Sequence, residues 1–282
     1  MKILLLILLT VLFPRFAFAV SDCDNYQTLH PEWDFCTDFE TGWPPDWDPS
    51  SDLSRTFVST TMPFQGTQSL EWVYLNNVDS SGFTYKFLSQ NYTELYLRWY
   101  LRLSSNWVGT GCAGGQCNTK GPIVNGSGFS LGSAVYHMQD SQNVNSPNYG
   151  IKTTKETNWD DTLIFQNVGT PVTWQNDRWY CVESHVKLNT PGQANGLAEM
   201  WIDDNQVINS PNHEFIGSSL SDPSPSNYHW NFLFWSGSKY PSSAGTQYRW
   251  YDNIIASSQR IGCFGTGPST LNAPTNLQVT IP

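Results

Sequence analysis

Apolar and polar residues alternate strictly along two neighbouring segments of the chain, residues 179–188 and 197–203. A period of two residues predicts β-strands, and the turn between them, rich in Asn, Pro and Gly, predicts a hairpin. One face of this hairpin is apolar. The other face concentrates titratable and aromatic residues: Glu183, His185, Lys187, Glu199 and Trp201. A register in which paired residue numbers sum to 384 would place His185 opposite Glu199, about 5 Å apart, and Glu183 opposite Trp201.

Strand-like runs recur along the chain and are separated by clusters of Gly, Pro, Ser and Asn. They are Asp34–Glu40, Ser69–Leu75, Phe83–Phe87, Glu94–Leu103, Ala134–Gln139, Tyr149–Thr154, Trp179–Leu188, Leu197–Asp203, His229–Trp235 and Gln247–Ser257. Many short strands with turn signals predict an all-β, antiparallel β-sandwich or jelly roll. We expect the first and last strands to be neighbours in one sheet. Residues 104–148, rich in Gly and Ser and poorly periodic, indicate binding loops.

The first 19 residues have a short basic start, an apolar run and small residues at the end. This pattern predicts a secretory signal peptide cleaved near Ala19, and the apolar run is too short for a membrane span. We therefore expect a secreted protein, extracellular or periplasmic, without membrane insertion. Residues 20–264 are predicted to form one jelly-roll domain, and residues 265–282 a linker-like tail.

The mature chain would carry 12 Lys and Arg against 24 Asp and Glu, a net charge of −12. This charge argues against nucleic acid as a partner. Aromatic residues make up 15% of the chain and charged residues only 13%, which favours an extracellular β-protein with rings for stacking on a ligand. Six cysteines in an exported chain predict disulfides, and Cys112 and Cys117 are expected to close a small loop. Three pairings remain open for the other four: Cys23, Cys36, Cys181 and Cys263.

The segment Glu94–Leu103 has one face of Leu and Trp, which predicts core, and one face of Tyr and Arg. On the second face, Arg98 and Arg102 suit bidentate binding of a carboxylate, and Tyr100 lies between them. Tyr interleaved with Arg favours a ligand cleft over an ordinary solvated face.

His185 is the best-placed base on the hairpin, with Glu199 to orient its imidazole. The alternative is a His–Glu pair that only stabilises the sheet. His137 is a rival base, and the alternation around it leaves open which face it occupies.

Flat aromatic rings bind the apolar face of a pyranose. The candidate rings of this kind are Trp107, Trp201, Trp235 and Tyr251. Lys187 and Arg249 are expected to contact the substrate as well. In the segment HWNFLFWSG, the set Trp230, Phe232 and Phe234 is interpreted as core.

Several runs of the chain resemble secreted proteins with the concanavalin-A-like jelly roll, in particular polysaccharide lyases of the alginate and glucuronan type. The runs are Trp179, Val186–Gly192, Gly196, Trp201–Asp203, the strand LYLRWYLRL and the closing YDNI. The resemblance implies a groove on the concave sheet and β-elimination on a uronate-containing glycan. It also implies that Lys120 matches a lysine before a central strand, and that His137 or Tyr136, and then Tyr149, match the later catalytic positions. The chain departs from the family after Tyr149, where a Tyr-x-Tyr pattern is absent.

A lyase must neutralise the uronate carboxylate, remove the proton at C5 and protonate the leaving oxygen. We expect Arg98 and Arg102 to serve the first task, His185 or Lys120 the second, and Tyr100 or Tyr149 the third. This chemistry requires no cofactor.

Related jelly rolls imply one structural Ca²⁺, here held by Glu40 and Asp252. Two alternative functions remain open. One is a non-catalytic, lectin-like carbohydrate-binding domain. The other is a glycoside hydrolase with Glu183 and Glu199 as its carboxylate pair, although the E-x-D-x-x-E strand of jelly-roll glucanases is absent.

Overall fold

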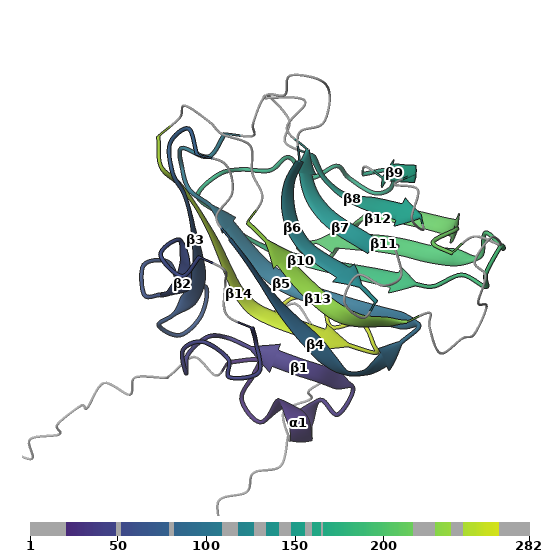
Figure 1. Cartoon of the computed structure of the whole chain (residues 1–282), viewed down its shortest axis with the longest axis horizontal. Helices are drawn as coiled ribbons and strands as arrows, with labels where there is room; N and C mark the ends of the chain where they lie inside the picture. The colour runs from purple at the N-terminus through teal and green to yellow at the C-terminus, as the bar shows by residue number, and fades with distance from the viewer. Residues whose placement is uncertain are drawn as a thin grey trace, which may run out of the picture.

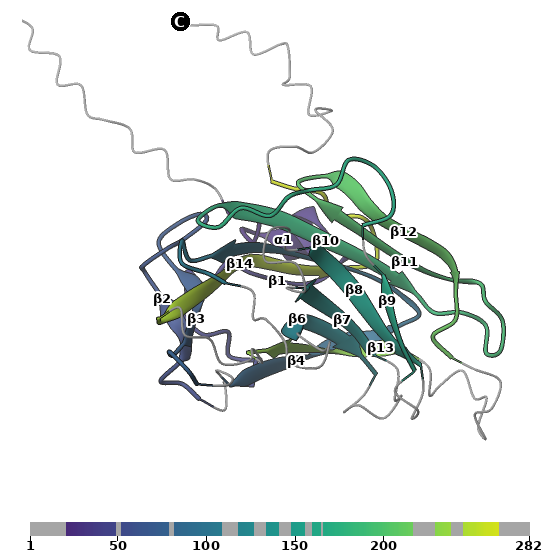
Figure 2. The same ribbon diagram turned by 90° about the horizontal axis from the view of Figure 1, so that it is seen from above.

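Two antiparallel sheets pack face to face in the part of the chain that the structure describes (Figure 1 and Figure 2). The computed structural model describes residues 21–48, 52–78, 82–108, 118–126, 134–140, 148–155, 160–164, 166–216, 229–237 and 245–264. The predicted signal peptide, the predicted tail, Cys112 and Cys117 lie outside these residues. The prediction of an all-β sandwich is confirmed.

The eight-stranded sheet has the order β12-β11-β10-β5-β14-β3-β2, and β1 pairs with β14 beside this path. Its strands are β1 (Trp33–Thr37), β2 (Thr56–Ser59), β3 (Ser69–Tyr74), β5 (Glu94–Leu103), β10 (Trp179–Lys187), β11 (Gly196–Ile202), β12 (Asn205–His213) and β14 (Gln247–Ser257). The pairing of β1 with β14 confirms that the first and last predicted strands are neighbours. The hairpin register is also confirmed, because His185 pairs with Glu199 and Glu183 with Trp201.

The six-stranded sheet has the order β4-β13-β6-β7-β8-β9. Its strands are β4 (Phe83–Tyr92), β6 (Asn118–Asn125), β7 (Ala134–Asp140), β8 (Asn148–Lys155), β9 (Asp160–Ile164) and β13 (Trp230–Ser236). In Figure 2 this sheet lies below the eight-stranded one. One short helix, α1 (Tyr26–Leu29), precedes β1.

The core fills the space between the two sheets. From β5 it takes the alternate residues Leu95, Leu97, Trp99, Leu101 and Leu103, as the period of two predicted. Val124 of β6, and Leu233 and Trp235 of β13, meet them from the six-stranded sheet. Each large apolar side chain buried in this way contributes about 1.5–3 kcal/mol relative to an exposed one, so these facing layers hold the sandwich together.

Four strands and the helix were not predicted: β2, β6, β9, β12 and α1. The most consequential is β6, which lies inside the region interpreted as binding loops. Gly121 and Pro122 are poor strand residues, and the pairing of β6 with β7 is irregular between Lys120 and Ile123. A strand with such an interruption loses the alternation by which it would be recognised.

Two disulfides join cysteines whose partners were open, Cys23 with Cys36 and Cys181 with Cys263. They agree with an exported protein. No helix in the described part of the chain has the length and apolar character needed to cross a bilayer.

Candidate functional site

The polar face of β5 and β10 is where the sequence predicted an open cleft. Its members do lie together on the outer face of the eight-stranded sheet, but segments from both ends of the described chain cover them. Arg98 is 1% exposed, and its Nη2 donates to Asp22 Oδ2 at 2.5 Å. Backbone N–H groups of Ile261 and Gly262 donate to Glu183, at 2.7 and 3.1 Å. The predicted cleft is therefore corrected to a buried docking surface for the chain's own ends.

His185 lies in the middle of this surface and is 3% exposed. Its Nδ1 is 2.7 Å from a Glu199 carboxylate oxygen and its Nε2 is 2.9 Å from a Glu94 carboxylate oxygen. The imidazole also stacks on Tyr96, with ring centroids 3.9 Å apart. Because both ring nitrogens are engaged, the contacts favour the sheet-stabilising alternative over a general base.

Burial also changes the acids of this surface. Desolvation raises the pKa of Glu183, and it raises the pKa of Tyr100 to about 12. The Tyr100 hydroxyl accepts a hydrogen bond from the Phe264 backbone N–H at 2.6 Å, and its ring stacks on Phe64. Burial would also raise the pKa of Glu94, but hydrogen bonds from Lys187 and His185 outweigh it and lower that pKa. Both the proposed acid Tyr100 and the hydrolase carboxylate Glu183 are therefore buried and out of reach of a polysaccharide.

The other residues of this face that were predicted to contact substrate interact with side chains of the protein itself. Arg102 pairs with Asp177 at 2.6 Å and Lys187 with Glu94 at 3.0 Å. Arg260 covers Trp201, with its guanidinium 4.6 Å from the ring centroid.

The other predicted contacts lie between the sheets: Trp107, Trp235, Arg249 and Tyr251 are buried. Trp235 stacks on Trp47 with ring centroids 4.8 Å apart, and Trp107 packs edge-on against Tyr74. Their roles as substrate platforms are corrected, because a sugar cannot reach them.

A group of rings with two exposed members lies instead on the outer face of the six-stranded sheet. We call it the aromatic face, and it consists of Phe83, Tyr85 and Phe87 of β4 with Phe232 and Phe234 of β13. Phe83 is 40% and Phe87 52% exposed. Phe87 and Phe232 have ring centroids 4.9 Å apart, and Phe83 and Phe234 5.3 Å.

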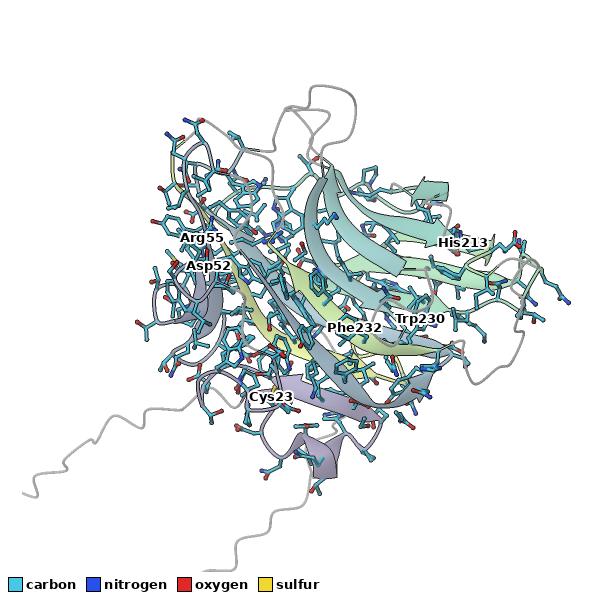
Figure 3. All side chains as sticks on the ribbon, viewed as in Figure 1. Cys23, Asp52, Arg55, His213, Trp230 and Phe232 are labelled. Carbon is cyan, nitrogen blue, oxygen red and sulfur yellow. A yellow bond between two sulfur atoms is a disulfide. The ribbon has the colours of Figure 1, made fainter. Side chains whose placement is uncertain are left out.

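The interpretation of Trp230, Phe232 and Phe234 as one core set is wrong. The pairing of β13 with β4 shifts between Trp230 and Phe232, which are both labelled in Figure 3. Residues before and after this shift therefore alternate in opposite phase. Trp230 stays in the core, whereas Leu233 and Trp235 replace the two Phe residues there. The sequence shows that β13 is rich in rings, but it does not show the bulge that places Phe232 and Phe234 on the outer face.

The aromatic face continues across the sheet through direct register partners, which share a face. Phe234 pairs with Tyr85 on one side and Ile123 on the other, Ile123 pairs with Tyr136, and Tyr136 pairs with Lys152. We call this line the cross-strand row. Lys120 pairs with Met138, two residues beyond Tyr136 on β7, and its half-buried side chain belongs to the same outer face.

The register of β7 bears on which of its positions have the core phase. His137 pairs with Ile151, a fully buried core residue, so position 137 has the core phase and position 136 the outer phase. Tyr149 shares the phase of Ile151, two residues away on β8. Of the residues implied by the family resemblance, Lys120 and Tyr136 lie on the neighbouring strands β6 and β7. The roles of His137 and Tyr149 stay predictions.

Glu40 and Asp252, the predicted Ca²⁺ ligands, both hold the loop before β3. Glu40 accepts hydrogen bonds from the backbone N–H groups of Thr67 and Gln68, each at 2.8 Å, and Asp252 accepts from Phe64 and Gln65 at 2.8 and 3.4 Å. N–H donors occupy these carboxylates, and no group of three or more acidic, His or Cys ligands forms among the described residues. The Ca²⁺ therefore stays a prediction.

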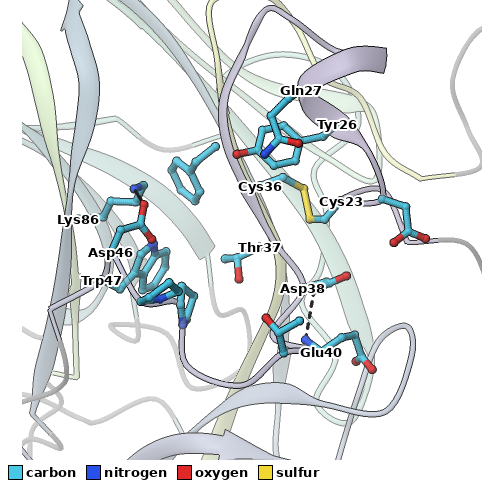
Figure 4. Close-up of a pocket in the computed structure, with 15 residues that line it drawn as sticks. Cys23, Tyr26, Gln27, Cys36, Thr37, Asp38, Glu40, Asp46, Trp47 and Lys86 are labelled. Carbon is cyan, nitrogen blue, oxygen red and sulfur yellow. Dashed lines mark hydrogen bonds and ion pairs between the residues drawn. A yellow bond between two sulfur atoms is a disulfide. The ribbon is translucent and has the colours of Figure 1, made fainter.

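Two hollows share Asp46 and Trp47, and one of them reaches the aromatic face. A pocket of about 470 Å³ between the N-terminal segment and residues 44–47 is lined by Asp38, Glu40, Asp46 and Trp47, beside the Cys23–Cys36 disulfide (Figure 4). Its lysine, Lys86, is ion-paired with Asp46. A second pocket of about 390 Å³ shares Asp46 and Trp47 with the first and takes Tyr85 and Phe87 from the aromatic face. The acidic wall of the first pocket argues against binding of a uronate there.

No family model matches the chain, and no curated protein matches it. Solved structures do. The alginate lyase from Aplysia kurodai is 12% identical, with a TM-score of 0.58 over 80% of this chain and 99% of that one. The alginate lyase Aly36B in complex with an alginate trisaccharide is 12% identical, with a TM-score of 0.57 over 80% and 98%. The endo-β-1,4-glucuronan lyase from the fungus Trichoderma reesei is 17% identical, with a TM-score of 0.53 over 80% and 96%.

This chain has the fold of these lyases. The resemblance expected from the hairpin and the closing strand is confirmed at the level of the fold.

Proposed function

We propose that the protein is a polysaccharide lyase that binds an acidic, uronate-containing glycan across the outer face of the six-stranded sheet. The observation that carries the proposal is the cross-strand row, which joins the aromatic face to the strands that bear Lys120 and Tyr136. Adjacent strands lie about 4.8 Å apart, so the six strands span roughly 24 Å, room for several sugar units. The fold shared with alginate and glucuronan lyases supports this choice of chemistry.

The two ends of the row suit different parts of a sugar. The rings of Phe83, Phe87 and Phe234 offer apolar surface for the C–H faces of pyranoses. Toward the other end, Lys120 and Lys152 are the basic residues of β6 and β8 on the outer phase. Lys152, as the register partner of Tyr136, is assigned to the uronate carboxylate.

The elimination then divides between two residues. Lys120, in its neutral form, takes the proton from C5 of the uronate. The electron pair of that C–H bond forms the C4–C5 double bond as the C4–O bond breaks. Tyr136 donates its hydroxyl proton to the leaving oxygen. The products are an unsaturated uronate end and a new hydroxyl, and no water is consumed.

The test is an assay of the mature protein on alginate, glucuronan, heparin-like and neutral glycans. A lyase produces ultraviolet absorbance from the unsaturated uronate, whereas a hydrolase releases reducing ends without that absorbance. We expect Lys120→Ala to abolish the absorbance signal. The matched control is Lys187→Ala, because Lys187 lies on the other sheet and pairs only with Glu94 at the surface. Equal loss in both variants would refute the assignment.

A non-catalytic carbohydrate-binding domain is the second candidate function. The aromatic face favours it, because stacking on Phe83 and Phe87 needs no catalytic base. A binding domain would be retarded in a gel containing the polysaccharide and would give neither product. In that case Lys120→Ala would leave the retardation largely intact.

A further inference from the structure

Arg249 of β14 reaches across the core from the eight-stranded sheet to the six-stranded one. Its Nη1 donates to the carbonyl oxygen of Lys120 and its Nη2 to that of Ser236, both at 2.9 Å. The guanidinium carbon is 5.2 to 5.6 Å from the ring centroids of Trp72, Tyr74 and Tyr251. Arg249 is 3% exposed, and its Nε has no hydrogen-bond partner.

This arginine carries its charge into the core without a carboxylate partner among the described residues. The contrast is Arg98, also buried, which pairs with Asp22. Removing a cation from water is costly, and carbonyl oxygens and ring faces only partly replace a counter-ion. Apolar side chains would fill the same space at lower cost, so stability alone does not account for a guanidinium here.

The two carbonyl groups that it binds lie where the β6 ladder is interrupted. Trp235 of β13 pairs with Pro122, which has no backbone N–H to donate. On the other side of β6, the pairing with β7 shifts between Lys120 and Ile123. Such irregularities re-aim the side chains beside them, and their backbone must be held by other donors. The guanidinium of Arg249, from the opposite sheet, supplies two N–H donors to the carbonyl groups beside this interruption.

We propose that Arg249 is a positioning residue for Lys120. It fixes the β6 irregularity so that the Lys120 side chain is held on the outer face, and it places a permanent positive charge directly behind the strand that meets the uronate. The inference rests on the proposed function, because it assigns Arg249 a role in the reaction of that face. It also replaces the sequence-based expectation that Arg249 touches the substrate.

The experiment compares Arg249→Met and Arg249→Lys with Arg98→Met and Arg98→Lys. Both arginines are buried and hydrogen-bonded, but Arg98 lies on the outer face of the eight-stranded sheet, so its variants report only the effect of losing a buried guanidinium. Each variant is assayed for kcat and KM on an oligouronate at a temperature at which it is folded. A misplaced catalytic group costs on the order of 100-fold, so we expect kcat of Arg249→Met to fall by about that factor. Arg249→Lys keeps the positive charge but not the two-armed guanidinium, so its kcat should lie between those of Arg249→Met and wild type. The kcat of the Arg98 variants should stay within about twofold of wild type.

A second readout does not depend on activity. Lysines are methylated with ¹³C-formaldehyde, and the Lys120 resonance is assigned by its absence in Lys120→Arg. We expect Arg249→Met and Arg249→Lys to move this resonance, and the Arg98 variants to leave it in place. If the wild type cleaves no glycan, the proposed function fails, while the Lys120 resonance still tests the contact between Arg249 and its strand. An unmoved resonance, or a wild-type kcat in the folded Arg249 variants, would overturn the inference. Should Arg249→Met not fold, Arg249→Lys alone decides by the same two readouts.

Discussion

His185 is held between the carboxylates of Glu94 and Glu199, and this contact sets its role. Replacing it by Ala leaves two carboxylates facing each other without the group between them. Losing a buried side chain that is hydrogen-bonded at both ring nitrogens costs about 1–3 kcal/mol, so we expect His185→Ala to lower the free energy of unfolding by that amount in a denaturant titration. Activity per folded molecule should not change. A variant that keeps its stability but loses its turnover would restore His185 as a candidate base.

Glu183 gives the buried surface a pH dependence. Desolvation raises its pKa in the folded state above the ordinary 4.5. The folded protein therefore binds this proton more tightly than the unfolded chain, so the stabilisation is complete below the ordinary pKa and is lost as the pH rises through the folded pKa. Glu183→Gln cannot titrate. The stability of Glu183→Gln relative to wild type should therefore increase as the pH rises from the ordinary pKa of 4.5 through the raised folded pKa. A constant difference across this range would contradict the burial argument.

Strands β4 and β13 present rings on the outer face, and the two Phe residues of β13 lie where the sequence predicted core. We expect Phe87→Ala to weaken binding of an oligosaccharide about 2- to 10-fold, because a ring contact is worth about 0.5–1.5 kcal/mol. Its stability should change little, since Phe87 is 52% exposed. Phe264→Ala is the matched control, because Phe264 is 44% exposed but belongs to residues 261–264, which cover the eight-stranded sheet. Equal binding by both variants in calorimetry would argue against the aromatic face.

Regular elements could be predicted from the sequence and interrupted ones could not. The alternation on β5, β10 and β11 predicted the buried face and even the pairing of His185 with Glu199. The same rule was wrong for β13, because a bulge after Trp230 inverts the phase and leaves no mark in the order of apolar residues. It missed β6, whose Gly and Pro resemble a loop. The candidate site is built on these two strands, which is why it was misplaced.

At the scale of the whole molecule, both ends of the described chain close over one outer face of the sandwich. A sandwich has two outer faces, and a period of two residues shows which side chains share a face but not whether a distant segment covers it. Asp22 and residues 261–264 cover the face of β5 and β10, so its titratable residues became internal contacts. The equivalent face of the six-stranded sheet keeps exposed rings.

The two disulfides secure this arrangement, and their loops differ in length. Cys181–Cys263 closes a separation of 82 residues and Cys23–Cys36 one of 13. Loop-closure entropy predicts losses of about 4.5 and about 3 kcal/mol when each pair is replaced by Ala. Unfolding titrations of the two double variants test this order. Both should retain glycan turnover where folded, and selective loss of turnover on removing Cys181–Cys263 would place the active surface back on the eight-stranded sheet.

The central claim is that the glycan lies on the outer face of the six-stranded sheet. Hydrogen–deuterium exchange of the mature protein, with and without a saturating oligosaccharide that it binds, tests this most directly because it reports on both sheets at once. We predict that bound sugar slows exchange in β4, β6, β7 and β13 and leaves β5, β10 and β11 unchanged. Slowed exchange confined to β5, β10 and β11 would contradict the account.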